Sequence, residues 1–174
     1  DAIGVKNYYK EFDYIIDCGD VFNLPTIYNP PIVRGDGLLV EKLEKYVTTE
    51  QDIPKIIQLE WADREAPPLH PQFFVDLADL IKGKVVVNCI GGHGRSGTTM
   101  VCLMMVFYPD YTPYMAMCHL RSMHCSRAIE GAAQHKYIGA FGTYLGREND
   151  IDKMKEVKSF KEALDKLTPQ QNKE

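Results

Sequence analysis

The chain has 174 residues, of which 45% are hydrophobic and 25% charged, and its formal net charge at pH 7 is −4. This size and apolar content predict one globular domain with a core of its own. The negative charge disfavours nucleic acid and anionic membranes as main partners, and the sequence has no apolar run long enough to span a bilayer.

Short apolar runs and helical patterns alternate along the chain. Strands are predicted at 12–17, 55–59 and 85–87. Helices are predicted at 71–81, 99–107, 113–123 and 134–145, with a shorter helix at 41–46 inside the irregular region 20–50. Because 85–87 is a run of valines, we expect that strand to be buried on both faces.

The last part of the chain, 148–174, has a different composition. It is rich in charge, and its apolar side chains recur every three or four residues at Ile151, Met154, Val157, Phe160, Leu164 and Leu167. This spacing predicts an amphipathic helix. We therefore expect a domain at 1–147 and a C-terminal helix at 148–174 that packs on this domain or, alternatively, contacts a partner or a second copy.

A glycine-rich segment follows the valine strand. It reads Cys89-Ile90-Gly91-Gly92-His93-Gly94-Arg95-Ser96-Gly97 and leads directly into a helix. Glycines let backbone N–H groups turn into one concavity, and a helix N-terminus adds a partial positive charge. The segment is typical of a phosphate-binding loop, in which we expect phosphate contacts from Ile90, Gly91, Gly92, His93, Gly94 and Arg95.

Three residues add reactive chemistry to this loop. A thiol beside a helix N-terminus and an arginine has a lowered pKa, so Cys89 is predicted to be a thiolate nucleophile at neutral pH. The planar guanidinium of Arg95 can bind two phosphate oxygens at once. The Ser96 hydroxyl is expected to donate a hydrogen bond to the sulfur when the thiolate acts as a leaving group.

Other interpretations fit the same residues less well. The stretch 92–97 matches the dinucleotide-binding pattern G-x-G-x-x-G. That pattern requires an acidic residue at the end of a second strand about 20 positions later, but the chain has Tyr108-Pro109-Asp110 there, at a predicted turn between two helices. The phosphate loop of NTPases requires a lysine where this chain has Thr98. A glycine turn with a purely structural Cys89 is the remaining alternative.

The spacing Cys-x5-Arg-Ser resembles the signature of the protein tyrosine phosphatase superfamily, and the short chain resembles its compact dual-specificity branch. The resemblance covers much of 13–145. It implies an α/β domain with a central, mostly parallel sheet flanked by helices on both faces. It also implies phosphomonoester hydrolysis through a cysteinyl-phosphate intermediate, without a metal or other cofactor. Where the family has histidine before the nucleophile, this chain has Asn88, whose amide can also hold the loop through hydrogen bonds.

The resemblance further implies a carboxylic acid that protonates the leaving oxygen. Trp61-Ala62-Asp63 resembles the family's Trp-Pro-Asp loop, with alanine in place of proline, so Asp63 is expected to be the general acid. Glu60 and Glu65 flank this loop and are the alternative acids. A solvated acidic loop without a catalytic role is a further alternative. Trp61 is expected either to anchor the hinge of the loop or to pack in the core.

A fainter resemblance lies at 126–134, just before the last predicted helix. This segment resembles the phosphatase loop whose two glutamines orient the hydrolytic water. Glu130 stands at the first glutamine position and Gln134 at the second. Gln134 is therefore a candidate for orienting water, and the alternative is a surface residue at the start of a helix.

The five cysteines are an odd number spread along the chain, which favours reduced thiols and a cytoplasmic location over a disulfide framework. Cys102 and Cys118 lie in apolar helical patterns and are predicted to be core residues. Cys18 or Cys125 is either a resolving thiol for oxidised Cys89 or an inert, packed residue.

The pairs Cys118-His119 and His124-Cys125 do not have a usual zinc-ligand spacing, so no metal site is predicted. A phosphorylated protein is the expected substrate, because the loop has no lysine and the chain is acidic. A phosphatase acting on RNA 5′-phosphate or on a small phosphoester is an alternative. Since Asn88 departs from the family pattern, a catalytically weak or silent phosphate-binding module is another.

Overall fold

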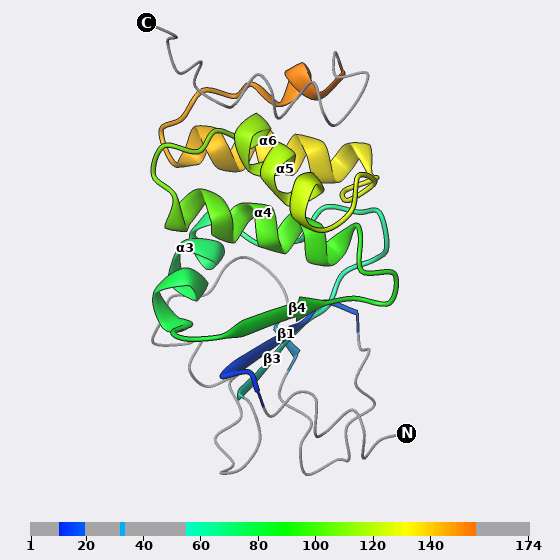
Figure 1. Cartoon of the computed structure of the whole chain (residues 1–174), viewed down its shortest axis with the longest axis vertical. Helices are drawn as coiled ribbons and strands as arrows, with labels where there is room; N and C mark the ends of the chain where they lie inside the picture. The colour runs from blue at the N-terminus through cyan, green and yellow to red at the C-terminus, as the bar shows by residue number, and fades with distance from the viewer. Residues whose placement is uncertain (1–10, 20–31, 34–54, 156–174) are drawn as a thin grey trace, which may run out of the picture.

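The computed structural model describes residues 11–19, 32–33 and 55–155. The helix expected at 41–46 and most of the amphipathic segment at 148–174 lie outside these residues. The described part is an α/β arrangement of a parallel sheet and stacked helices (Figure 1). None of the helices in this part is long and apolar enough to cross a membrane.

The sheet has four described strands in the order β2-β3-β1-β4. These are β1 (Tyr14–Asp17), β2 (Ile32–Val33), β3 (Lys55–Leu59) and β4 (Val85–Asn88). All neighbouring pairs are parallel, so the carboxyl ends of the strands meet at one edge. The mostly parallel sheet implied by the resemblance is confirmed. The two-residue strand β2 is too short to leave a periodic pattern, and the sequence did not predict it.

The valine strand β4 is less buried than the sequence predicts. All of its residues are half-buried, and among the described strands it pairs only with β1. In contrast, β1 has neighbours on both sides and all of its residues are buried. The expected burial of β4 on both faces is therefore wrong, because a run of valines does not distinguish a central strand from a terminal one.

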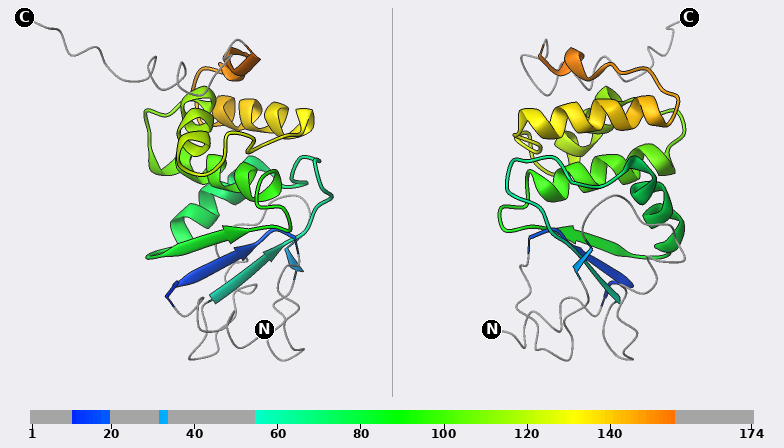
Figure 2. Two further views of the ribbon diagram at one scale, coloured as in Figure 1. Left: turned by 45° about the vertical axis from the view of Figure 1, so that its right-hand side comes forward. Right: turned by 180° about the vertical axis from the view of Figure 1, so that it is seen from behind.

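The helices stack in layers on the sheet. They are α3 (Pro71–Leu80), α4 (Arg95–Phe107), α5 (Pro113–Met123) and α6 (Ala132–Tyr144), followed by the short 3-10 helix η3 (Ile151–Lys155). Helices α3 and α4 contact each other next to the sheet, α5 and α6 pack on α4, and η3 contacts α5 and α6 (Figure 1). Figure 2 shows these described helices on one side of the sheet. On its opposite face Ile15 and Ile56 are buried with Val86 against them.

Local sequence explains where two of the helices begin. Helices α3 and α5 each start with a proline, whose missing N–H has no partner at this position in any helix. The preceding side chain caps each helix. His70 Nδ1 accepts a hydrogen bond from the Gln72 N–H at 3.1 Å, and the Thr112 hydroxyl accepts one from the Met115 N–H at 3.3 Å.

The hydrophobic core lies between the sheet and the helices. At its centre, the Phe74 ring meets the rings of Phe73, Tyr137 and Phe141 edge to face, with centroids 5.3, 6.1 and 5.9 Å apart. The three phenylalanines are fully buried. Burying such a side chain contributes roughly 1.5–3 kcal/mol relative to leaving it exposed. These rings therefore hold α3 and α6 together through large apolar contacts.

The first residues of the C-terminal segment pack on the helices of the domain. The Tyr114 N–H donates a hydrogen bond to the buried Asp150 carboxylate at 2.9 Å. The Cys118 thiol lies 3.8 Å from the Met154 sulfur. These contacts join η3 and the preceding loop to α5, while the domain boundary at 147 and the helix beyond 155 stay predictions.

Candidate active site

The glycine-rich loop joins the carboxyl end of β4 to α4. Helix α4 begins at Arg95, inside the loop, and not at Thr99 as predicted. Gly92 has a φ of +68°, which favours glycine, and its N–H donates to the Cys89 carbonyl at 3.2 Å. The Ile90 side chain is 78% exposed, so this residue can contact phosphate only through its backbone. The loop therefore folds over the positive end of α4, where an anion is favoured.

Cys89 is buried at the start of this loop, with its sulfur 3.3 Å from the Ser96 hydroxyl oxygen. Burial raises the pKa of the Cys89 thiol. Hydrogen bonds from the Ser96 side chain, from the Ser96 and Gly92 N–H groups, and the charge of Arg95 lower it by more, so the net pKa lies below its ordinary value. The predicted contact between Ser96 and the sulfur is present in the structure.

Arg95 connects the loop with the segment that follows β3. Its Nη1 donates to the Trp61 carbonyl at 3.3 Å, and its Nε lies 3.8 Å from the Asp63 Oδ1. The arginine side chain is 11% exposed and that of Asp63 is 73% exposed. The structure thus brings the predicted arginine and the predicted acid into contact, with the nucleophile close enough to be influenced by the arginine charge.

The segment 60–65 after β3, called the acid loop below, presents Asp63 toward the phosphate loop and holds Trp61 inside the protein. Trp61 is buried, whereas Asp63 and Glu65 are exposed. The Glu65 N–H donates to the Ala62 carbonyl at 3.2 Å, and Arg64 has a φ of 63°, so the chain turns sharply at this point. Among the described residues, Asp63 is the carboxylate that pairs with Arg95, which favours it over Glu60 and Glu65 as the acid.

Gln134 lies beneath the phosphate loop. It is fully buried, and its Oε1 accepts a hydrogen bond from the Gly131 N–H at 3.2 Å. A Cβ at Gly94 would come within 3.1 Å of the Gln134 Nε2, and this nitrogen is buried without a hydrogen-bond partner in the described part. The alternative of a surface glutamine is therefore wrong. An unpaired amide donor beside the loop suits the orientation of water or phosphate.

A loop at 125–131 joins the phosphate loop to the acid loop. The Ile129 N–H donates to the His93 carbonyl at 3.0 Å, which ties this loop to the phosphate loop. A Cβ at Gly131 would overlap the Arg64 carbonyl oxygen, so only glycine lets the backbones approach this closely. Glu130 is exposed and stands next to this contact. The second predicted glutamine position therefore reaches the site, and the first one points outward.

Arg121 and His124 also support the site, and the sequence did not predict these roles. Arg121 donates from Nε to the Ala128 carbonyl at 3.0 Å and from Nη2 to the Ile129 carbonyl at 3.2 Å. His124 Nε2 lies 2.6 Å from the Gly92 carbonyl oxygen, so this nitrogen carries the proton and donates. A basic residue in the last turn of an otherwise apolar helix was the one available signal for Arg121.

The residue before the nucleophile does not act as expected. Both polar atoms of the Asn88 amide are buried, and neither has a hydrogen-bond partner in the described residues. The expected stabilisation of the loop by this amide is therefore not observed. The loop packs closely against Gly19. A Cβ at this position would approach the Ile90 nitrogen to 3.2 Å and the Arg95 Cζ to 3.4 Å.

The other four cysteines differ in burial. Cys102 and Cys118 are fully buried, which confirms the prediction of core positions. Cys18 is buried as well, with its sulfur 3.4 Å from the Thr99 hydroxyl, and burial strongly raises its pKa and that of Cys102. Cys125 is half-buried, and all five thiols are free. Cys89 is thus the buried thiol whose pKa is lowered.

Comparisons with known proteins identify the fold. No protein-family model matches the chain, and a search of curated proteins finds no significant match. Among solved structures, the chain is similar to Tk-PTP in its active form, with 18% identity, a TM-score of 0.58, and coverage of 82% of this chain and 86% of that one. A glycine-to-alanine mutant form of Tk-PTP matches with 17% identity and a TM-score of 0.58, covering 83% and 85% of the two chains.

A third structure is the kinase associated phosphatase with its catalytic-site cysteine replaced by serine. It is 20% identical, with a TM-score of 0.52, and the match covers 84% of this chain and 76% of that one. The fold of the chain is therefore that of cysteine-dependent, protein tyrosine phosphatase-like enzymes. This agrees with the resemblance that the loop sequence carries.

Proposed function

We propose that the protein is a metal-independent phosphomonoester hydrolase of the protein tyrosine or dual-specificity type. The observation that carries this proposal is the convergence of three groups at the N-terminus of α4. Cys89 has a lowered pKa, Arg95 lies beside it, and Asp63 contacts Arg95 at 3.8 Å. The phosphatase-like fold supports the same reaction class.

In the first step, the Cys89 thiolate attacks phosphorus while the phosphate is held by the loop N–H groups and the Arg95 guanidinium. The sulfur–phosphorus bond forms and the bond from phosphorus to the leaving oxygen breaks. Asp63 transfers its proton to that oxygen, which is otherwise a poor leaving group. The contact between Asp63 and Arg95 supports this role, because the carboxyl group then lies near the phosphate that Arg95 is proposed to bind.

In the second step, water attacks phosphorus and the thiolate leaves. The Asp63 carboxylate takes a proton from the water, and the Ser96 hydroxyl donates a hydrogen bond to the departing sulfur, from which it lies 3.3 Å in the free protein. The buried Gln134 Nε2, which has no partner in the described part, is the group we assign to orienting the water.

A phosphorylated protein is the proposed substrate, in a reducing compartment such as the cytoplasm. The free state of all five cysteines supports the compartment. The acidic net charge of −4 argues against a polyanionic substrate. Phosphopeptides, 5′-phosphorylated RNA and small phosphoesters should be compared at equal concentration, and a clear preference for RNA or metabolites would overturn the protein-phosphatase assignment.

The reaction is tested with an activated aryl phosphate in the presence of a chelator. We expect either a burst of aryl product equal to the enzyme concentration or steady turnover during which phosphate can be trapped on Cys89. Cys89→Ser should abolish turnover yet still bind phosphate, whereas Cys125→Ser should keep both. Arg95→Lys should be severely impaired, because an ammonium does not reproduce the bidentate contact. Retained turnover in Cys89→Ser would contradict the mechanism.

A catalytically silent phosphate-binding module is the second candidate. The Asn88 amide favours it, since this residue stands where the resembling family has histidine and its buried polar atoms make no hydrogen bond in the described part. The same assay separates the two functions. A silent module would bind phosphate in the wild-type chain without any burst or turnover.

A further inference from the structure

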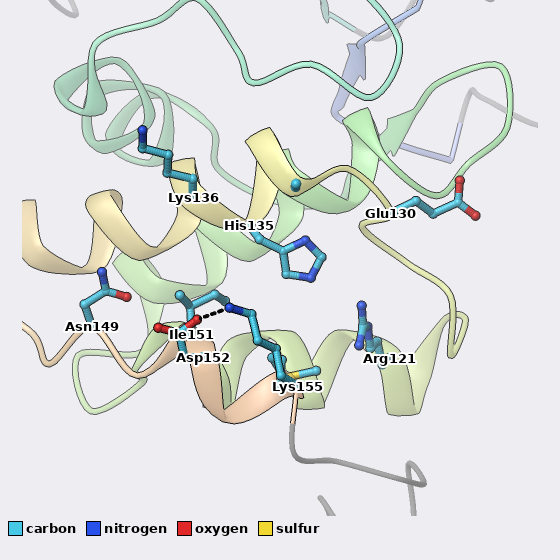
Figure 3. Close-up of a pocket in the computed structure, with 10 residues that line it drawn as sticks. Arg121, Glu130, His135, Lys136, Asn149, Ile151, Asp152 and Lys155 are labelled. Atoms are coloured by element: carbon cyan, nitrogen blue, oxygen red, sulfur yellow. Dashed lines mark ion pairs between the residues drawn. The ribbon is translucent and has the colours of Figure 1, made fainter.

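A cavity of about 630 Å³ lies between α5, α6 and η3, on the outer side of the helical layers (Figure 3). Residues of its wall include Arg121 from α5, His135 from α6, and Ile151, Met154 and Lys155 from η3. Its size falls in the range of cavities that bind small molecules. None of the groups assigned to the phosphatase reaction lines this cavity.

The cavity wall holds three cations, the exposed Lys136 and Lys155 and the half-buried Arg121. Arg121 has no carboxylate partner among the described residues. Two of its nitrogens donate to the carbonyls of Ala128 and Ile129, and no ion pair involves it among the described residues. The side chain is half-buried, and burial lowers its pKa. An arginine keeps its positive charge in proteins. A partly desolvated guanidinium without a counter-ion favours binding of an anion.

His135 is the second polar group of the cavity. Its Nδ1 lies 2.9 Å from the Gly131 carbonyl oxygen, so this nitrogen carries the proton. Its Nε2 is then left for a ligand, as a donor in the protonated ring or as an acceptor from an acidic hydroxyl in the neutral one. Figure 3 shows His135 and Arg121 approaching the same space from the two helices.

The acidic residues at the cavity do not neutralise the positive charge of Arg121. Asp152 is paired with Lys155 at 2.8 Å. Glu130 points away from the other lining residues in Figure 3. The apolar side chains of Ile151 and Met154 also line the cavity.

We propose that this cavity is a second ligand site, which binds a small amphiphilic anion. Its carboxylate or phosphate head contacts Arg121 and His135, and its apolar body packs on Ile151 and Met154. The site is separate from the phosphate loop. Its two polar residues, Arg121 and His135, also form hydrogen bonds to backbone carbonyls of the loop at 125–131, which contacts the phosphate loop. Its existence does not depend on the phosphatase activity.

The full chain with ¹³C-labelled methionine methyl groups provides the test, because Met154 reports locally on the cavity. The probes are 3-phenylpropionate and its neutral amide, which share the apolar body and differ in charge. We expect a saturable shift of the Met154 methyl signal with the carboxylate and a much weaker one with the amide. No saturable shift, or equal binding of both probes, would overturn the proposal and would leave the phosphatase assignment untouched.

Two matched charge reversals locate the binding. Lys155→Glu places a second negative charge beside Asp152 at the cavity and should weaken 3-phenylpropionate by roughly tenfold. Lys84→Glu makes the same change at an exposed lysine that does not line the cavity, and should have little effect. Equal effects of the two variants would place the ligand elsewhere. Arg121→Gln should abolish binding, with Lys155→Glu as the decisive variant if the Arg121 variant does not fold.

Discussion

The sulfur of Cys89 is surrounded by donors that the sequence only partly indicates. The hydroxyl of Ser96 was predictable because it follows Arg95 in the motif. The N–H groups of Gly92 and Ser96 are also aimed at the sulfur, and this depends on how the loop folds over α4. The failure of Asn88 to make a hydrogen bond was not predictable, because it depends on neighbours that are distant in the sequence.

The lowered pKa of Cys89 predicts its reactivity with iodoacetamide. The thiolate is the reactive form, so alkylation should stay fast as the pH falls below about 8.5 and should decline only below the depressed pKa. Ser96→Ala removes one stabilising hydrogen bond and should move this midpoint upward. A midpoint that does not change in Ser96→Ala would show that the backbone N–H groups and Arg95 suffice. Cys125→Ser serves as the control that the alkylated thiol is Cys89.

The proposed role of Asp63 as general acid predicts that the rate loss on its replacement depends on the leaving group. Asp63→Asn should slow hydrolysis of a phosphotyrosine peptide by about two orders of magnitude, because the phenoxide then leaves unprotonated. Activated aryl phosphates should be affected far less. Glu60→Gln and Glu65→Gln are the matched controls, measured with the same two substrates. If one of them showed this pattern and Asp63→Asn did not, the acid would be misassigned.

At the scale of elements, the long helices were predictable and their contacts were not. The apolar periodicity and the capping residues predicted α3 and α5 within a residue or two of their observed ends. The buried position of Gln134 and the support by Arg121 could not be predicted, because each depends on α5, α6 and the 125–131 loop meeting in space. The two-residue strand β2 has no periodic signal at all.

The close approach of Gly131 to the acid loop predicts a strong effect of a single methyl group. Gly131→Ala places a Cβ onto the Arg64 carbonyl oxygen, so the two loops must separate. We expect a loss of about 1–3 kcal/mol in the free energy of unfolding and a lower kcat, because Asp63 lies next to Arg64. Urea unfolding and steady-state kinetics measure both. Ala132→Ser, at the neighbouring exposed position, should change stability by less than about 0.5 kcal/mol.

At the scale of the whole molecule, the order of strands and helices was predictable and the place of each strand was not. The alternation of short apolar runs with helical patterns, together with the phosphatase resemblance, predicted the α/β class. The position of β4 at the end of the described sheet could not be read from its valines. Burial of a strand depends on which strands pair with it, and that is a property of the complete fold.

The aromatic centre of the core predicts where the molecule is most sensitive. Phe74→Ala removes a fully buried ring that contacts three others and should lower the free energy of unfolding by about 3–5 kcal/mol. Phe107→Ala removes a ring that is 51% exposed and should cost much less. Chemical denaturation of both variants provides the comparison. Equal losses would mean that the core is not organised around Phe74.

The contact between Arg95 and Asp63 has a consequence for the free protein. In the proposed reaction the Arg95 guanidinium binds the phosphate of the substrate, so the Asp63 carboxylate would act as an internal competitor for this group. Incoming phosphate has to displace this internal anion, and the freed carboxyl then faces the leaving oxygen. Because Asp63 is 73% exposed, the competition is weak, and its removal should tighten phosphate binding only a few-fold. On the proposed mechanism, substrate binding would therefore free Asp63 from Arg95.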